Sequence, residues 1–216
     1  MKRRDFSRAA TGAAVLTSLA PLSGWTQAAK PLAGTDYQVL DTRAPVDAPA
    51  GKIEVVEFFW YSCPHCNAFE PALEAWVKKL PKDVAFRRAP VAFRDDFVPQ
   101  QRLYFALDAM GLVDKLHAKV FTAIHGEKLN LAKADAIIEW VARQGVDRAK
   151  FVEQFNSFTT ATKSSRAAKL QNEYRVEGVP ALGIAGRFYT DGSLARSMER
   201  ALQVADSLMA DVRAGR

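Results

Sequence analysis

The sequence predicts an α/β protein whose sheet is interrupted in the chain by a block of helices. The apolar run at residues 53–59 is typical of a buried strand, and helical periodicity extends through residues 97–174. Two short strand candidates then follow at residues 181–184 and 187–189. Of the 216 residues, 49% are hydrophobic and 25% are charged, which excludes disordered and fibrous classes.

Residues 1–28 have the composition of a cleaved export signal. A basic start precedes a mildly apolar segment and Thr26-Gln27-Ala28, a small-x-small cleavage pattern. Within the start, Arg3-Arg4-Asp5-Phe6 resembles a twin-arginine signal, although Ser7 stands where a large aliphatic residue is usual. The alternative is an amphipathic N-terminal helix, which Pro21 and the lack of an apolar stripe disfavour. We therefore expect an exported protein, by the twin-arginine or the general secretory route.

The net charge depends on whether that segment is removed. The full sequence has 30 Lys and Arg against 24 Asp and Glu, a net charge of +6. Cleavage after Ala28 removes four basic residues and one acidic residue, which leaves 26 against 23, or +3. No cluster of basic and aromatic side chains remains, so we expect no nucleic-acid partner. The longest apolar stretch is interrupted by Thr17, Ser18 and Pro21, so no bilayer-spanning helix is expected.

The first part of the mature chain is predicted to form strands around one helix. A Pro- and Gly-rich lead-in comes first. The predicted elements are an edge strand at 37–40, a central strand at 53–59, a helix at 67–80 and a strand at 84–89. The central strand is apolar except for Glu54 and Glu57, which indicates burial on both faces. Pro71 inside the helix removes one backbone hydrogen bond and is expected to bend it.

The helical block follows, and strands return after it. Its helices are recognised by apolar residues three or four positions apart: Leu103, Leu107 and Met110; Leu116, Val120 and Ile124; Ile137, Ile138 and Val141; Phe151, Val152 and Phe155; and a last helix at 161–174. Asp147 is a good N-cap for the helix that carries Phe151. Ala185-Gly186 separates the two later strands as a two-residue hairpin turn, and apolar residues from Leu202 to Val212 predict a C-terminal helix.

Both cysteines of the chain lie in one Cys63-Pro64-His65-Cys66 motif at the junction of the central strand and its helix. A disulfide that closes so short a loop adds little stability, so redox chemistry is the better interpretation. At this junction Cys63 is near the helix N-cap and Pro64 occupies the first helical position. Cys63 therefore faces unpaired backbone N–H groups and the positive end of the helix dipole, which lower its pKa. His65, when it is protonated or donates an N–H hydrogen bond, stabilises the Cys63 thiolate further. A more stable reduced form makes the disulfide a stronger oxidant.

Other interpretations of the motif fit less well. A zinc site needs a fourth ligand, and only His117 and His125 remain, in the helical block and without ligand spacing. Haem attachment needs His after the second cysteine, where the sequence has Asn67. A purely structural disulfide is disfavoured by its position at the start of a helix with Pro64. We therefore predict no metal site and no cofactor.

The segment from Glu57 to Cys66, Glu-Phe-Phe-Trp-Tyr-Ser-Cys-Pro-His-Cys, resembles the active-site segment of the DsbA family of periplasmic thiol:disulfide interchange proteins. Gly178-Val179-Pro180-Ala181 resembles the second signature of the family, in which the proline peptide is cis. The resemblance implies a thioredoxin-like fold with a helical domain inserted between the third strand and the cis-proline strand. It divides the chain into a signal peptide (1–28), a thioredoxin-like domain (29–96 and 175–216) and an inserted helical domain (97–174).

The resemblance also assigns roles to individual residues. Cys63 is the attacking cysteine and Cys66 the resolving one, while Pro64 and His65 tune the pair. Val179 and Pro180 form the loop where an extended substrate chain pairs beside Cys63; without the cysteine motif, an ordinary trans-proline turn would be the expected structure.

Glu57 corresponds to a buried acid that shuttles the proton of Cys66, the alternative being a strand residue that reaches solvent. Trp60 and Tyr61 either complete the core or line a peptide groove.

The expected function is a periplasmic dithiol oxidase that donates the Cys63/Cys66 disulfide to newly exported proteins. The resemblance implies reduced, unfolded exported proteins as clients, a DsbB-type membrane quinone reductase as reoxidant, and a monomer. The alternative is a periplasmic disulfide reductase or isomerase on the same fold. The Pro-His dipeptide and the lack of a recognisable dimerisation domain disfavour an isomerase. The intact cysteine pair also disfavours a non-catalytic chaperone, and a relative of the glutathione transferases ordinarily lacks the second cysteine.

Overall fold

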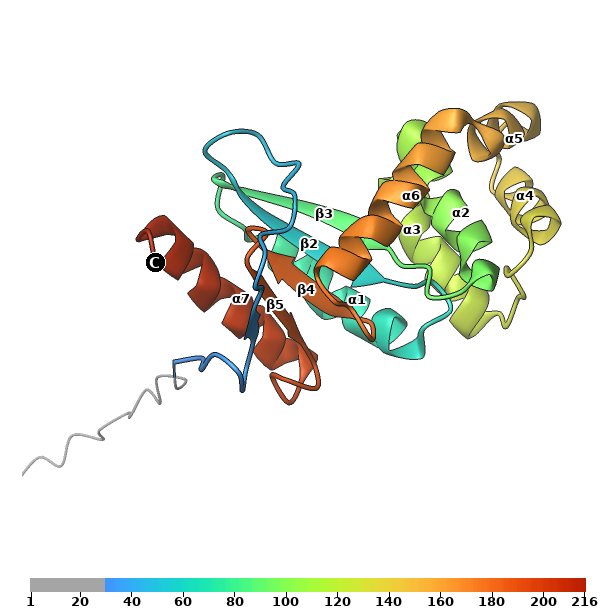
Figure 1. Cartoon of the computed structure of the whole chain (residues 1–216). Helices are drawn as coiled ribbons and strands as arrows, with labels where there is room; N and C mark the ends of the chain where they lie inside the picture. Colours follow the sequence, from blue (N-terminus) through green and yellow to red (C-terminus); the bar gives the residue numbers. More distant parts are fainter. Residues whose placement is uncertain (1–29) are drawn as a thin grey trace, which may run out of the picture.

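The computed structural model describes residues 30–216, in two parts that lie side by side (Figure 1). One part is a sheet with its covering helices, and the other is a block of helices. The predicted signal segment, 1–28, lies outside the described residues. In the described part of the chain, no helix is both long and apolar enough to cross a bilayer.

The sheet has five strands in the order β1-β5-β4-β2-β3. They are β1 (Gln38–Val39), β2 (Ile53–Phe59), β3 (Val84–Pro90), β4 (Ala181–Ile184) and β5 (Phe188–Asp191). Strand β2 runs parallel to β3 and antiparallel to β4. All seven residues of β2 are buried, which confirms the predicted central strand, and β1 is the predicted edge strand.

The helical block enters the chain between β3 and β4, as predicted. It consists of the short helical turn η1 (Asp95–Phe97), α2 (Val98–Ala109), α3 (Val113–Phe121), the π-helical turn η2 (Thr122–Gly126), α4 (Ala134–Arg143), α5 (Arg148–Asn156) and α6 (Phe158–Glu173). Asp147 caps α5 by accepting the N–H of Lys150 at 3.0 Å, which confirms the predicted cap. Helix α6 begins before the predicted residue 161 because Ser157 caps it through the N–H of Thr160.

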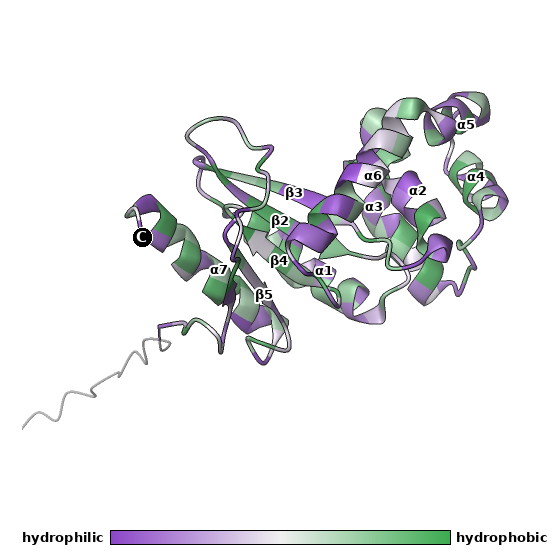
Figure 2. Ribbon diagram, in the orientation of Figure 1, coloured by the Kyte–Doolittle hydropathy of each residue, from purple (hydrophilic) through white to green (hydrophobic). Residues whose placement is uncertain are grey.

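Two apolar layers hold the sheet in place. Helices α1 (Pro64–Val77) and α7 (Met198–Arg213) pack on one face, around Val55, Leu73 and Leu182. The helical block packs against Val56 and Phe58, which alternate with Val55 along β2 and face the other way. Hydrophobic and hydrophilic stretches alternate along the helices, and β3 carries a hydrophilic stretch beside its hydrophobic one (Figure 2). A strand buried by helices on both sides explains the continuous apolar run in the sequence.

The β4–β5 hairpin turns at Ala185-Gly186, as predicted, but Ile184 pairs with Phe188, so three residues and not the predicted two lie between the strands. Ala185 and Gly186 both have positive φ, 55° and 67°, as a type I′ turn requires. Arg187 closes this turn through its N–H to the carbonyl of Ile184 (2.9 Å), so β5 begins at Phe188 and not at the predicted residue 187. The hydroxyl of Tyr174, from the end of α6, accepts the N–H of Gly186 at 3.0 Å. The turn is therefore tied to the last helix of the block.

Candidate active site

Cys63 is the N-cap of α1, and Pro64 lies in its first turn, as predicted. The Cys63 Sγ accepts the backbone N–H of Cys66 at 3.4 Å, and both cysteines are free thiols in this structure. The fixed φ of Pro64 suits the first turn of a helix, where its missing N–H has no partner to lose. The motif thus folds locally into a helix start that points backbone N–H groups at one sulfur atom.

The pKa of Cys63 is lowered from its ordinary value of 9.0 to about 6. The largest cause is the thiol of Cys66, which donates a hydrogen bond to the thiolate. The backbone N–H groups of Cys66 and His65 and the charge of His65 act in the same direction, against the burial of the sulfur. His65 itself is exposed, so its charge acts through solvent and contributes less than the N–H groups do.

Cys66 has the opposite environment. Its side chain is 0% exposed, whereas Cys63 retains 6% exposure. Burial is the largest cause that raises the pKa of the Cys66 thiol far above its ordinary value, the hydrogen bond and negative charge of Cys63 raise it further, and Glu57 adds to the rise when it is ionised. At neutral pH the pair therefore has one thiolate, at Cys63, which keeps a little exposure, and one thiol, at the fully buried Cys66.

The Val179–Pro180 peptide bond is cis, as the resemblance implies. Its loop lies directly against the motif, since the Cys63 Sγ is 3.3 Å from the carbonyl oxygen of Val179, to which Cys63 donates a hydrogen bond when it is a protonated thiol. Pro180 is buried and precedes β4. The two signature segments, 116 residues apart, thus meet at one sulfur atom.

Glu57 is fully buried in β2, so its side chain does not reach solvent. Its partner is Arg88, which stands opposite it in the parallel register of β2 and β3, with Arg88 Nε 2.9 Å from Glu57 Oε2. Burial nevertheless raises the pKa of Glu57 from 4.5 to about 8, with Arg88 opposing the rise. Arg88 is shared with Glu70 (3.2 Å) and Glu74 (2.6 Å), so its charge is not available to Glu57 alone.

The segment between β2 and Cys63 is held by the helical block. Gln100 of α2 accepts the N–H of Ser62 (3.2 Å) and donates to the Ser62 hydroxyl (2.7 Å). His125 of η2 lies 2.8 Å from the carbonyl of Tyr61. In residues 30–216, no three His, Cys, Asp or Glu side chains are grouped to hold a metal ion.

The two aromatic residues before the motif lie in different environments. Tyr61 is 1% exposed and belongs to the core. Trp60 is partly exposed and stacks on Phe97, with the two ring centroids 3.9 Å apart. Sequence reasoning missed Arg88, Glu70 and Gln100. The only signal for Arg88 was a charged pair, Arg87-Arg88, inside an otherwise apolar strand.

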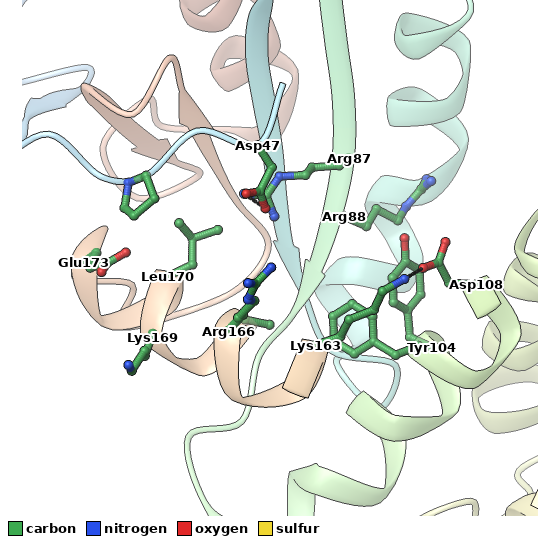
Figure 3. Close-up of a pocket in the computed structure, with 13 residues that line it drawn as sticks. Asp47, Arg87, Arg88, Tyr104, Asp108, Lys163, Arg166, Lys169, Leu170 and Glu173 are labelled. Carbon is green, nitrogen blue, oxygen red and sulfur yellow. Dashed lines mark hydrogen bonds and ion pairs between the residues drawn. The ribbon is translucent and has the colours of Figure 1, made fainter. Parts of the chain in front are cut away.

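A cavity of about 600 Å³ lies between β3, α2 and α6 (Figure 3). Tyr104, Arg166 and Leu170 are among its lining residues, and Lys163 forms an ion pair with Asp108 (2.6 Å) at its edge. Neither cysteine and no residue of the cis-proline loop lines it. The cavity is therefore separate from the paired sulfur atoms.

One activated cysteine beside one buried cysteine, at a helix start on a thioredoxin-like sheet, defines the class of thiol:disulfide oxidoreductases. Comparison with known proteins narrows the class. Residues 54–203 match the family described as DSBA-like thioredoxin domain, and the chain belongs to this family. It is a dithiol oxidase.

Several relatives are similar over nearly the whole chain. A thiol:disulfide interchange protein DsbA of Burkholderia cepacia is 43% identical over 200 residues, which cover 92% of this chain and 94% of the relative. One from Bordetella parapertussis is 43% identical over 216 residues, 99% of this chain and 100% of the relative. The crystal structure of Pseudomonas aeruginosa DsbA has a TM-score of 0.81 and 40% identity, covering 86% of this chain and 96% of that structure. Sequence and backbone therefore agree on the fold that was predicted.

Proposed function

We propose that this oxidase works in the periplasm, where it donates the Cys63/Cys66 disulfide to newly exported, reduced and unfolded proteins. The observation that carries the proposal is the contrast between the two sulfur atoms, a stabilised thiolate at Cys63 and a buried thiol at Cys66. A cysteine pair whose reduced form is stabilised by a thiolate, here at Cys63, gives up the disulfide of its oxidised form readily. The basic start and cleavage pattern of residues 1–28 support export.

The first step is attack by a client thiolate on the Cys63 Sγ of the oxidised pair. The bond between Cys63 and Cys66 breaks, a mixed disulfide forms between client and Cys63, and Cys66 leaves with the electron pair. A second client thiolate then attacks the client sulfur of the mixed disulfide, and Cys63 leaves as a thiolate. The client gains a disulfide, and two electrons remain on the reduced cysteine pair.

Glu57 is proposed to supply the proton that Cys66 takes up when it leaves. Its raised pKa of about 8 keeps it protonated near neutral pH, although it lies in an ion pair with Arg88. In the reverse direction Cys66 must lose that proton before it attacks Cys63, and a carboxylate with a pKa near the working pH accepts it efficiently. Buried Cys66 has no access to solvent for the same exchange.

Val179 and Pro180 are proposed to bind the client chain, and Pro64 and His65 to tune the pair. The carbonyl of Val179 lies 3.3 Å from Cys63 Sγ, so a client backbone that pairs with this loop has its cysteine at the reacting sulfur. Pro64 fixes the helix start, and His65 adds positive charge to it.

Residues 29–96 and 175–216 are proposed as the thioredoxin-like domain, and residues 97–174 as the inserted helical domain. We further propose that the protein is a monomer without a cofactor and that a DsbB-type membrane quinone reductase removes the two electrons.

The equilibrium of the Cys63/Cys66 pair with glutathione tests the proposal. We expect the purified mature protein to be a stronger oxidant than a thioredoxin, and to oxidise a reduced, unfolded protein stoichiometrically. Cys66→Ser serves as the control because it keeps the reactive sulfur but has no disulfide to donate. A thioredoxin-like potential would favour the reductase instead, and restoration of scrambled disulfides without net oxidation would favour the isomerase.

A further inference from the structure

We propose that His117, on helix α3 of the helical block, is a positioning residue that keeps Glu57 protonated by holding Glu70 as an anion against Arg88. The inference rests on the proton-transfer role proposed for Glu57. It extends that role to a side chain that touches neither cysteine. It also gives the helical block a part in the chemistry.

A continuous chain of polar contacts joins His117 to Glu57. Its successive contacts are Tyr61 Oη to His117 Nδ1 (2.9 Å), His117 Nε2 to Glu70 Oε1 (3.2 Å), Arg88 Nη2 to Glu70 Oε2 (3.2 Å) and Arg88 Nε to Glu57 Oε2 (2.9 Å). Arg88 extends toward α1, on the opposite side of β3 from Arg87 (Figure 3). Glu70 lies one helical turn after Cys66 on α1, so the chain runs alongside the cysteine pair.

The protonation state of the imidazole follows from its neighbours. His117 is 5% exposed, and burial among the rings of Phe59, Tyr104 and Phe121 lowers its pKa, so it is neutral at pH 7. Glu70 is ionised, because the hydrogen bond from His117 and the charge and hydrogen bond of Arg88 lower its pKa against its own burial. A carboxylate has no proton to donate, so Nε2 carries the hydrogen toward Glu70. Nδ1 then accepts from the hydroxyl of Tyr61.

The anion at Glu70 affects Glu57 in two ways that add. Its negative charge directly raises the pKa of Glu57, after burial and against Arg88. It also engages Arg88, whose single positive charge is divided among Glu57, Glu70 and Glu74. Without the hydrogen bond from His117, Glu70 would lose a major stabilisation of its charged form and take up a proton more readily. Arg88 would then face Glu57 with less competition, and Glu57 would ionise at lower pH.

Packing alone does not account for a histidine at this position. A phenylalanine would fit among the four aromatic rings around it, including that of Tyr61, but it would leave the buried Tyr61 hydroxyl and Glu70 Oε1 without the partner that the imidazole provides. The charged and titratable groups that face His117 are Glu70 and Glu74 from α1, Arg88 from β3, Tyr61 from the segment after β2 and Tyr104 from α2. Of these, only Tyr61 and Glu70 form hydrogen bonds with the imidazole.

The experiment is an NMR titration of the Glu57 carboxyl carbon in the reduced mature protein, with Glu57→Gln used to assign the signal. His117→Leu removes the donor to Glu70 and is expected to lower the Glu57 midpoint by about half a pH unit or more. His117→Gln, which places an amide donor near Nε2, is expected to restore the wild-type midpoint. His117→Asn is polar but too short to reach Glu70, and it replaces the leucine variant if that protein does not fold.

Tyr104→Phe is the matched control, because it removes a buried hydroxyl from the same cluster but not from the chain of contacts. A Glu57 midpoint that is unchanged in the leucine or asparagine variant would overturn the proposal, even if the melting temperature of that variant falls. His117 would then be a packing residue. The pH profile of client oxidation is a separate readout. If the midpoint moves but the rate profile does not follow it, the role of His117 stands and the role proposed for Glu57 fails.

Discussion

The depressed pKa of Cys63 predicts that the reduced form gains stability over the oxidised form as pH rises. The perturbation is reduction of the Cys63/Cys66 disulfide at a series of pH values. In the folded protein Cys63 ionises near pH 6, and in the unfolded chain near its ordinary value of 9.0. A depressed folded pKa contributes stability that is fully present above the unfolded value and is lost as pH falls through the folded value. The window is therefore about pH 9 down to pH 6.

The magnitude follows from the two pKa values. Linkage gives about 0.1 kcal/mol at pH 5, about 1.4 kcal/mol at pH 7 and about 2.7 kcal/mol at pH 8. Pro64 and His65 beside the sulfur are exposed, so solvent screening reduces these figures to roughly half. The oxidised form keeps a loop-entropy contribution of about 2 kcal/mol that does not depend on pH. On these figures the reduced form is still less stable than the oxidised form at pH 7, and the difference narrows as pH rises to 8.

The assay is urea unfolding of both redox forms from pH 5 to pH 8, with the difference in unfolding free energy plotted against pH. Glu57 is present in both forms, so its own titration largely cancels in the difference. Cys63→Ser under reducing conditions is the control, because it lacks the thiolate and should lose the pH-dependent gain. A difference that stays constant from pH 5 to pH 8 would refute the claim that the helix start stabilises the Cys63 thiolate.

Four further predictions concern the cysteine pair, the buried acid and, in two variants, the contacts of Tyr174 with the hairpin. Cys66→Ser should accumulate mixed disulfides with clients on non-reducing gels and Cys63→Ser almost none; equal trapping would remove the distinction between attacking and resolving sulfur. Glu57→Gln should slow client oxidation about tenfold or more and abolish the limb of the rate profile near pH 8, measured by stopped flow, whereas an unchanged profile would exclude it as the proton donor. Tyr174→Phe should lower the unfolding free energy by about 1–2 kcal/mol, since the N–H of Gly186 loses its acceptor. Gly183→Ala should cost about 2 kcal/mol, because a Cβ there would collide with the Tyr174 ring, and wild-type stability of either variant would contradict this packing.

The features that the sequence predicted correctly depend on neighbouring residues. The Cys63 cap, the helix start at Pro64 and the Ala185-Gly186 turn each follow from backbone preferences within a few positions. The central strand was also predictable, because burial on both faces leaves an apolar run. The family signatures supplied the remaining long-range contact, between Cys63 and the Val179 carbonyl.

The features that could not be predicted depend on register and on contacts between distant segments. Arg88 meets Glu57 only because β2 and β3 pair in one particular register, and a strand sequence does not fix the register of its partner. The hydroxyl of Tyr61 has a hydrogen-bond partner inside the core, because His117, which is 56 residues away in the chain, accepts it there. The sequence considered His117 only as a possible metal ligand, since a lone histidine on a helix does not reveal which carboxylate it will meet.

The two cysteines therefore acquire their opposite properties from different levels of the structure. Cys63 is activated locally, by N–H groups and a thiol that belong to its own four-residue motif. Cys66 is suppressed by the tertiary structure, because the sheet and the helical block bury it and place Glu57 near it. Substitutions at Pro64 or His65 act on the first property, whereas substitutions along Arg88, Glu70 and His117 act on the second. Redox poise and proton transfer can thus be altered separately, although the reacting sulfur atoms are separated by only two residues in the chain.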